Sequence, residues 1–165
     1  MSGGIDSTVA ALLLHNEGYE VVGITMKTWD YSTSNTNGKE TGCCNIDSFN
    51  DARLAAVNNG FPHFILDIRD EFGDFVIENF VEEYLAGRTP NPCVMCNEKV
   101  KFGNLWSKAK AVGAEYIATG HYAVVDHLED RSVLRKGVDP RKDQSYFLFS
   151  LRQEQLRRTL FSRGA

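Results

Sequence analysis

The sequence predicts an α/β protein built on a parallel, doubly wound sheet, and three observations point to this fold class. Short apolar segments of strand length alternate along the chain with segments that have the apolar spacing of helices. The strand segments are almost continuously apolar, as parallel strands covered on both faces are. A glycine-rich turn leads straight into the first helical segment, as it does where a strand meets a helix at a phosphate site.

The first half of the chain continues this alternation after the turn. The patterns predict a helix over residues 7–16, a strand over 19–26, a polar loop over 32–42, a helix over 48–59 and a strand over 63–68. Gly18 and Gly60 follow the two helices, where glycine commonly ends a helix. The loop is rich in turn-forming residues, so we expect it to move or to become ordered on binding.

The second half begins with the same alternation and then changes. The patterns predict helices over 70–86 and 97–112, a strand over 115–119, a hairpin of 122–127 with 132–136, and a last helical stretch over 145–161. Ligands of doubly wound sheets bind beyond the carboxyl ends of strands, where Gly120 and His121 stand. Because a strand would normally precede the opening turn, we expect that the sequence lacks the first strand of the sheet.

Composition agrees with one globular domain. The 165 residues, of which 42% are hydrophobic and 24% charged, are enough for a sizeable core and exclude a disordered chain. No apolar run reaches the roughly 18 to 20 residues that a membrane span needs, and the start lacks the pattern of a secretion signal. We therefore expect a cytoplasmic protein without a membrane partner, in which cysteines are more often catalytic or metal-binding than bridged.

Charge is distributed unevenly, although the net charge is only −4. Residues 1–130 carry 9 basic and 19 acidic side chains, whereas residues 131–165 carry 9 basic and 3 acidic ones. We therefore divide the chain into a domain over 1–130 and a basic extension over 131–165, of the kind that meets a polyphosphate. A solvated helical face is the alternative explanation of the same charges.

The opening string SGGIDST, residues 2–8, has the properties of a phosphate-binding loop. Glycines let the backbone close around an anion, and the following helix adds partial positive charge at its N-terminus. Asp6 is unusual, because a carboxylate repels phosphate unless it accepts a backbone hydrogen bond or holds a magnesium ion. The motifs of Walker nucleotidases and of dinucleotide enzymes are absent. A helix-capping turn, with Ser2 or Asp6 as the cap, is the alternative.

The string RTPNPCVMCNEKVKF contains a second candidate site, Cys93 and Cys96. We expect both cysteines to stand just ahead of a helix that begins near Asn97. The N-terminus of that helix stabilises a thiolate, and Lys99 and Lys101 add to the effect. The spacing leaves four interpretations: an inert buried pair, a redox pair or half of a zinc site, a sulfur-transfer nucleophile, or two ligands of an iron–sulfur cluster.

Five strings are characteristic in combination: SGGIDST at Ser2, GITMK at Gly23, AGRTPNP with CN and KF between Ala86 and Phe102, YIATGHYA at Tyr116, and KDQSYFL at Lys142. The first resembles the pyrophosphate loop of the N-type ATP pyrophosphatases. Together they resemble the N-terminal catalytic domain of the tRNA-specific 2-thiouridylases over nearly all of the chain. The resemblance implies a sheet of the adenine-nucleotide alpha-hydrolase-like type, with residues 1–130 as the pyrophosphatase domain.

The resemblance also implies a role for each matching position. The ATP phosphates would be held by Met1, Ser2, Gly3, Gly4, Ile5, Asp6, Ser7 and Thr8. Met26 and Gly120 would lie at the nucleotide, and Cys96 would be the nucleophile. The target base, extruded from its stack, would be bordered by Asn91, Pro92 and Cys93. The tRNA would be contacted by Lys142, Asp143 and Gln144. From the residues alone, Met26 is equally well core filling, His121 a hydrogen-bonded strand-end histidine and Lys142 a surface cation.

The implied reaction is the ATP-dependent synthesis of 2-thiouridine in tRNA. ATP with Mg²⁺ would adenylate C2 of the wobble uridine in tRNAs for Lys, Glu and Gln. Persulfide sulfur, delivered by a relay carrier protein, would then replace the adenylate. Cys96 and Cys93 would be the catalytic cysteines, and Asp6 would orient the metal or the loop.

The chain departs from the family pattern at two points. Cys93 stands where the family commonly has aspartate, which favours a redox pair or a [4Fe-4S] cluster held with Cys96. The family's second catalytic cysteine would lie beyond residue 165, so we expect the chain to be incomplete for the full reaction. Cys43 and Cys44 are assigned no chemistry. The rival hypotheses are another N-type pyrophosphatase that adenylates a small molecule, and a non-catalytic nucleotide- or RNA-binding module.

Overall fold

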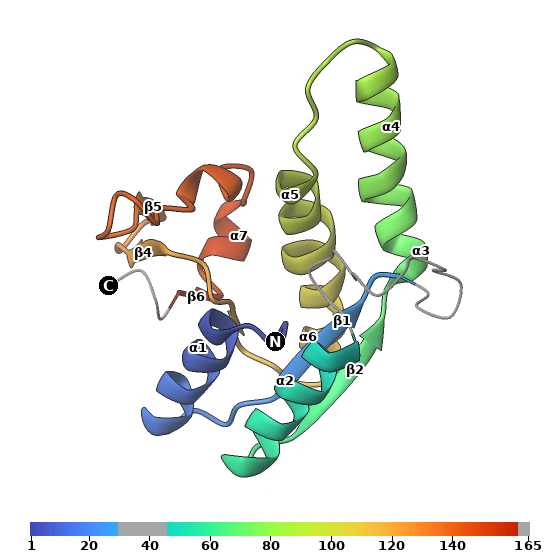
Figure 1. Ribbon diagram of the computed structural model, residues 1–165. Helices are drawn as coiled ribbons and strands as arrows, with labels where there is room; N and C mark the ends of the chain where they lie inside the picture. Colours follow the sequence, from blue (N-terminus) through green and yellow to red (C-terminus); the bar gives the residue numbers. More distant parts are fainter. Residues whose placement is uncertain (30–45, 162–165) are drawn as a thin grey trace. The chain divides into compact units, whose positions relative to one another are not determined.

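The computed structural model describes residues 1–29 and 46–161, which belong to two compact units (Figure 1). Unit 1 is Met1–Arg69 and unit 2 is Asp70–Ala165. Three features of the sequence analysis lie outside the described residues: the loop over 32–42, Cys43 and Cys44. No helix in the described part of the chain is long and apolar enough to cross a bilayer.

Unit 1 contains α1 (Ile5–Asn16), β1 (Gly23–Lys27), α2 (Ile46–Asn58) and β2 (His63–Asp67). β1 and β2 pair in parallel, from Gly23 opposite His63 to Lys27 opposite Asp67. The expected elements are confirmed, but β1 starts later than the strand pattern over 19–26. The parallel pairing starts at Gly23, where β2 first supplies a partner. The amide of Gly23 donates to the carbonyl of Pro62, the residue before β2, at 2.8 Å.

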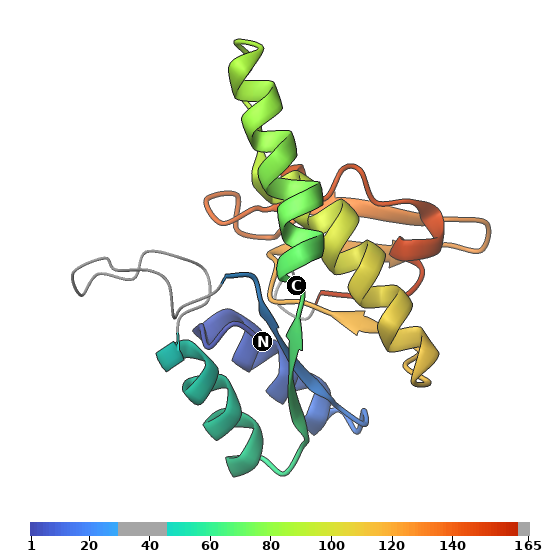
Figure 2. The same cartoon turned by 90° about the vertical axis from the view of Figure 1, so that its right-hand side faces the viewer.

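Small residues bring the two helices of unit 1 together. Ala11 of α1 and Ala56 of α2 are buried with Phe61 in one apolar cluster, against which Met1, Leu12 and Val21 pack. Short side chains at a helix contact allow a close approach of the axes. Figure 2 shows both helices beside the β1–β2 pair. The opening residues thus join the core through Met1.

Two long helical segments open unit 2, as expected. The first consists of α3 (Arg69–Phe72), the π-helical η1 (Gly73–Ile77) and α4 (Glu78–Leu85). The second consists of α5 (Pro92–Met95), the π-helical η2 (Cys96–Leu105) and α6 (Trp106–Ala111). This second segment begins at Pro92, so the expectation that the cysteines stand ahead of a helix starting near Asn97 is wrong. Asn91 caps the segment by accepting from the amide of Val94 at 3.3 Å. Pro92 suits the first helical position, where no amide is needed.

The strands of unit 2 are β3 (Ile117–Ala118), β4 (Ala123–His127), β5 (Ser132–Lys136) and β6 (Thr159–Leu160). β4 and β5 form the expected antiparallel hairpin, and β3 pairs in parallel with β6. β3 is shorter than the strand expected over 115–119, because its partner supplies only two residues.

The expected helix over 145–161 is wrong. This stretch forms a 3-10 turn, η3 (Ser145–Phe147), a short helix, α7 (Gln153–Leu156), and then β6. Leu148, Leu151 and Leu156, whose spacing suggested one helix, are buried by this succession of turns and the short helix α7. The α/β class with parallel strand pairs is nevertheless present in both units.

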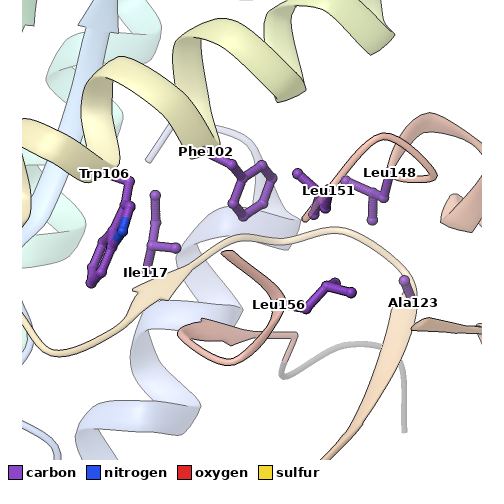
Figure 3. Close-up of a cluster of buried hydrophobic side chains, with 7 residues drawn as sticks. All are labelled: Phe102, Trp106, Ile117, Ala123, Leu148, Leu151 and Leu156. Carbon is purple, nitrogen blue, oxygen red and sulfur yellow. The ribbon is translucent and has the colours of Figure 1, made fainter. Parts of the chain in front are cut away.

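One apolar cluster holds unit 2 together, as Figure 3 shows: Phe102, Trp106, Ile117, Ala123, Leu148, Leu151 and Leu156. Phe102 is only 1% exposed. A hydrogen bond also joins α7 to η2, since Gln155 Nε2 donates to the carbonyl of Phe102 at 2.7 Å. The helical segment that carries Cys96 is therefore fixed to β3 and to the last residues described.

Candidate functional site

The turn of the opening loop requires glycine at residue 3. Gly3 has a φ of +74°, and a Cβ there would lie 2.3 Å from the carbonyl oxygen of Ser48 in α2. The loop therefore packs against the first turn of α2 while it leads into α1. Two helix N-termini consequently meet at the loop, and their dipoles favour an anion.

Hydroxyl groups hold this loop in shape. Ser7 Oγ accepts from the amide of Ser2 at 3.0 Å and donates to the carbonyl of Gly4 at 3.1 Å. Thr8 Oγ1 donates to the same carbonyl at 3.1 Å. α1 follows Gly4, which is extended and makes no side-chain capping bond, so the alternative of Ser2 or Asp6 as the helix cap is wrong. Glycines, hydroxyls and a helix N-terminus together fit a polyphosphate.

Buried Thr25 anchors the start of the loop to β1. Its Oγ1 donates to the carbonyl of Met1 at 2.6 Å and lies 2.8 Å from His63 Nε2. Burial, followed by the charges of the Met1 amino group and Arg53, lowers the pKa of His63, which favours a neutral ring beside the hydroxyl. Met26, half-buried, is the next residue of β1. Sequence reasoning missed Thr25 and His63, because their contact depends on strand register.

The two cysteines of the described chain lie in the first turns of the second helical segment. Cys93 is exposed and Cys96 is partly buried, and neither forms a disulfide within the described part of the chain. A spacing of three residues puts them on neighbouring positions of one helix side. Lys99, which was expected to support a thiolate, forms an ion pair with Glu98 at 2.6 Å. Its charge is therefore shared with that carboxylate.

The donor sets fit the implied groups unequally. The loop fits ATP phosphates, and the exposed carboxylate of Asp6 is of the type that Mg²⁺ prefers. Within residues 1–29 and 46–161, no three His, Cys, Asp or Glu side chains gather at a point that could hold a metal ion. An iron–sulfur cluster takes about four protein ligands, so the pair Cys93 and Cys96 gives it no support.

Asn97 joins the second helical segment, which carries both cysteines, to the turn η3. Its side chain is 2% exposed and donates from Nδ2 to the carbonyl of Phe147 at 3.1 Å. Its Oδ1 is buried and has no hydrogen-bond partner among the described residues. The residue beside Cys96 is thus held by the segment that follows Gln144.

Gly120 and His121 follow β3, but the histidine is not poised for proton transfer near neutral pH. Burial, assisted by the charge of Lys101, lowers the pKa of His121 to about 3. Its Nδ1 lies 2.8 Å from Thr119 Oγ1, and its ring meets Phe161 edge to face at 6.2 Å between centroids. His121 is thus a hydrogen-bonded histidine at a strand end, which was the alternative interpretation.

The segment Lys142, Asp143 and Gln144 wraps around Tyr122. Lys142 is exposed, with Nζ 5.1 Å from the centroid of the Tyr122 ring. Gln144 bonds the backbone of Tyr122 twice, and Asp143 accepts from Gly137 and Ser145. The three predicted tRNA contacts therefore differ in accessibility.

Basic side chains between residues 131 and 161 are all exposed: Arg131, Arg135, Lys136, Arg141, Lys142, Arg152, Arg157 and Arg158. Arg163 lies outside the described residues. Arg135 pairs with Asp126 at 2.5 Å and Arg141 with Asp139 at 3.4 Å. Exposed ion pairs are weak, so these two pairs neutralise little of the positive charge of the segment.

Each unit gathers part of the predicted site. Unit 1 holds the loop 1–8 and Met26, and unit 2 holds the rest. Within unit 2, hydrogen bonds connect Tyr122, two residues after Gly120, to the 142–144 segment, and Phe147 to Asn97 beside Cys96. A hollow of about 530 Å³ in unit 2, bordered by residues such as Trp106 and Arg157, includes none of the predicted site residues.

Comparison with known proteins identifies relatives of this chain. It is 60% identical over 164 residues to the tRNA-specific 2-thiouridylase MnmA of Amoebophilus asiaticus, covering 99% of this chain and 44% of that protein. It is 59% identical over 168 residues to the protein of the same name from Salinibacter ruber, covering 100% of this chain and 44% of the relative. For the one from Cytophaga hutchinsonii the identity is 57% over 164 residues, covering 99% and 45%.

The chain thus spans less than half the length of these relatives. Its whole length, residues 1–165, matches the family model described as the tRNA methyl transferase HUP domain. This match confirms the expected fold class, in which a nucleotide-binding loop precedes a helix beside parallel strands. The chain belongs to the tRNA methyl transferase HUP domain family.

Proposed function

We propose that this chain carries out the ATP-dependent step of tRNA 2-thiouridine synthesis, the adenylation of C2 of a wobble uridine, and supplies Cys96 for the sulfur transfer that follows. One observation carries the proposal. A glycine and hydroxyl loop suited to polyphosphate and a helix-borne thiol occur in one chain whose relatives are named tRNA-specific 2-thiouridylases. The substrates are tRNAs for Lys, Glu and Gln, and the reaction takes place in the cytoplasm.

The nucleotide part of the proposal assigns ATP to residues 1–8, with Met26 and Gly120 at the nucleotide. The uridine oxygen is a poor leaving group, and its attack on the α-phosphate converts it into adenylate while pyrophosphate leaves. The backbone amides of Gly3 and Gly4 would stabilise the charge that develops on the phosphates. Mg²⁺, held by Asp6 and the phosphates, would neutralise the pyrophosphate.

The sulfur part assigns the nucleophilic role to Cys96, with Asn91, Pro92 and Cys93 beside the flipped base. The terminal sulfur of a persulfide attacks C2, and AMP leaves. The Cys96 thiolate then attacks the bridging sulfur, which releases 2-thiouridine and forms a disulfide between Cys96 and the donor cysteine. The donor persulfide comes from a relay carrier protein or from a part of a longer chain. Cys93, an exposed thiol three residues before Cys96, is the second candidate for the thiolate that attacks the bridging sulfur.

An exchange assay tests the proposal. Unmodified tRNA should stimulate the exchange of pyrophosphate into ATP, and Cys96→Ser should keep this exchange because adenylation does not need the thiol. With a persulfide donor and a longer chain, the same variant should lose thiolation. Stimulation by a small metabolite and not by tRNA would indicate a different N-type pyrophosphatase. ATP binding without pyrophosphate release at any tRNA concentration would indicate a non-catalytic module.

The proposed division of labour follows the charge distribution. Residues 1–130 form the pyrophosphatase domain, and residues 131–165 form the basic extension that holds tRNA through the 142–144 segment. The extension's exposed cations support this assignment, because phosphate contacts dominate the affinity of proteins for nucleic acids.

A further inference from the structure

Asp143 lies within the proposed tRNA segment but faces the chain itself. Its Oδ1 accepts from the amides of Gly137 at 2.7 Å and Ser145 at 3.2 Å, and its Oδ2 accepts from Ser145 Oγ at 2.9 Å. Burial opposes its ionisation, but these hydrogen bonds outweigh it and hold the pKa of the carboxyl below its usual range. Both oxygens are therefore engaged in closing the loop between Gly137 and Ser145.

Gln144 fastens the same loop to Tyr122. Its Oε1 accepts from the amide of Tyr122 at 3.0 Å, and its own amide donates to the carbonyl of Tyr122 at 2.9 Å. Gly137, at the other end of the loop, packs closely against the same carbonyl, because a Cβ at residue 137 would lie 2.9 Å from the Tyr122 oxygen. The loop thus closes around the backbone of one residue.

Lys142 is the member of the trio that faces solvent. Its ammonium lies 5.1 Å from the centroid of the Tyr122 ring, a distance at which a cation is attracted to an aromatic face. Neighbouring Arg141 shares its charge with Asp139 at 3.4 Å. The bonds of Asp143 and Gln144 therefore define where the Lys142 charge stands.

We infer that Asp143 and Gln144 are positioning residues, and that Lys142 alone of the three contacts the tRNA backbone. The inference rests on the proposed function for its ligand. A carboxylate next to a polyanion weakens binding unless it organises the cations around it, and the loop geometry supplies that reason. Asp143 accepts hydrogen bonds from backbone amides of its own loop and does not contact tRNA.

The test is tRNA binding by the 165-residue chain at several salt concentrations. Lys142→Ala should weaken binding. It should also reduce the magnitude of the slope of log K against log salt by about 1, as expected for one lost phosphate contact. Asp143→Ala should weaken binding to a similar extent, whereas Asp143→Asn, which retains an acceptor for the two amides, should bind nearly as the wild type. Glu129→Gln, an exposed carboxylate of the same unit, is the charge control and should not weaken binding.

A double variant decides whether Asp143 acts through Lys142. Lys142→Ala with Asp143→Ala should bind no more weakly than Lys142→Ala alone, because the loop would no longer carry a charge to position. Additive losses, or equal losses for Asp143→Ala and Asp143→Asn, would overturn the inference in favour of direct tRNA contact.

Hydrogen exchange supplies a readout that does not depend on tRNA. In the wild type the amides of Gly137 and Ser145 should be protected, and Asp143→Ala should make them exchange faster by at least about tenfold while β1 is unchanged. Unprotected amides in the wild type would contradict the inference. If the amides respond as expected but no variant or wild type binds tRNA, the proposed function is wrong and the loop closure stands.

Discussion

At the scale of single residues, Gly3 is needed for two separate reasons, its backbone conformation and the close approach of Ser48. Alanine with a left-handed backbone costs about 1 to 2 kcal/mol, and forced contacts in a packed site cost about 1 to 3 kcal/mol more. Gly3→Ala should therefore lower the free energy of unfolding by both amounts and weaken ATP binding, as urea titration and nucleotide titration would measure.

Gly18 offers the matched control for Gly3. It also has a positive φ, +93°, but a Cβ there would meet nothing within 4 Å. Gly18→Ala should therefore cost only the backbone part, about 1 to 2 kcal/mol, and leave ATP affinity unchanged. Equal effects of the two substitutions would mean that Ser48 moves aside and that the loop is less closely packed than the structure indicates.

His121 should make the stability of the protein depend on pH. Its pKa falls from 6.5 to about 3, chiefly through burial, so the unfolded chain binds a proton in this range that the folded chain does not. The stabilising effect is complete above pH 6.5 and is lost as the pH falls toward 3, at up to about 1.4 kcal/mol per pH unit.

The measurement for His121 is the free energy of unfolding between about pH 7 and about pH 5, in urea, for the wild type and His121→Gln. The wild type should lose stability on acidification more steeply than the variant. His63, whose pKa is also lowered, contributes to both proteins, so the difference isolates His121. Parallel pH curves would show that His121 is solvated and protonates freely.

Residue types predicted the nucleotide loop but not its surroundings. The glycine at residue 3 and the following helix were visible in SGGIDST, because local backbone demands are written in local residues. The contact of Thr25 with Met1 and His63 was not visible, since it depends on which residues of two strands face each other. The inward-facing bonds of Asp143 were equally hidden, because its partners are identified only once the loop closes.

At the scale of elements, the start of the cysteine helix shows how a turn signal can begin a helix. Pro90 and Pro92 restrict the chain, but Pro92 suits the first helical position and Asn91 caps it. The sequence pattern placed both cysteines in a turn, whereas the structure places them in the helical segment. The predicted helix over 145–161 was wrong for another reason. Its leucines have helical spacing, but Thr159 and Leu160 pair with β3 as a strand.

The Asn91 cap predicts the stability of this helix start. Asn91→Ala removes the acceptor for the amide of Val94 and should lower the free energy of unfolding by about 1 kcal/mol, whereas Asn91→Asp should retain most of it. Urea unfolding of the three proteins would measure the difference. An alanine variant as stable as the wild type would mean that Pro92 alone begins the helix.

At the scale of the whole molecule, the proposed binding of tRNA by an acidic protein depends on the distribution of its charges, not on their sum. The net charge of −4 predicts repulsion of tRNA, and only the concentration of exposed cations after residue 130 predicts attraction. This property could be counted from the sequence. Which cations are held in place, and by what, required the hairpin and the loop around Tyr122.

Two triple variants with the same change of net charge would separate distribution from sum. Changing Arg131, Lys136 and Arg158 to glutamine should weaken tRNA binding and lower its salt slope by up to about 3, because each lost phosphate contact lowers the slope by about 1. Changing Arg53, Arg69 and Lys108, which lie within the acidic residues 1–130, to glutamine should leave the slope within about 1 of the wild type, since Arg69 and Lys108 already pair with carboxylates. Equal effects of the two sets on the slope would show that tRNA responds to net charge alone, and the basic segment would lose its special role.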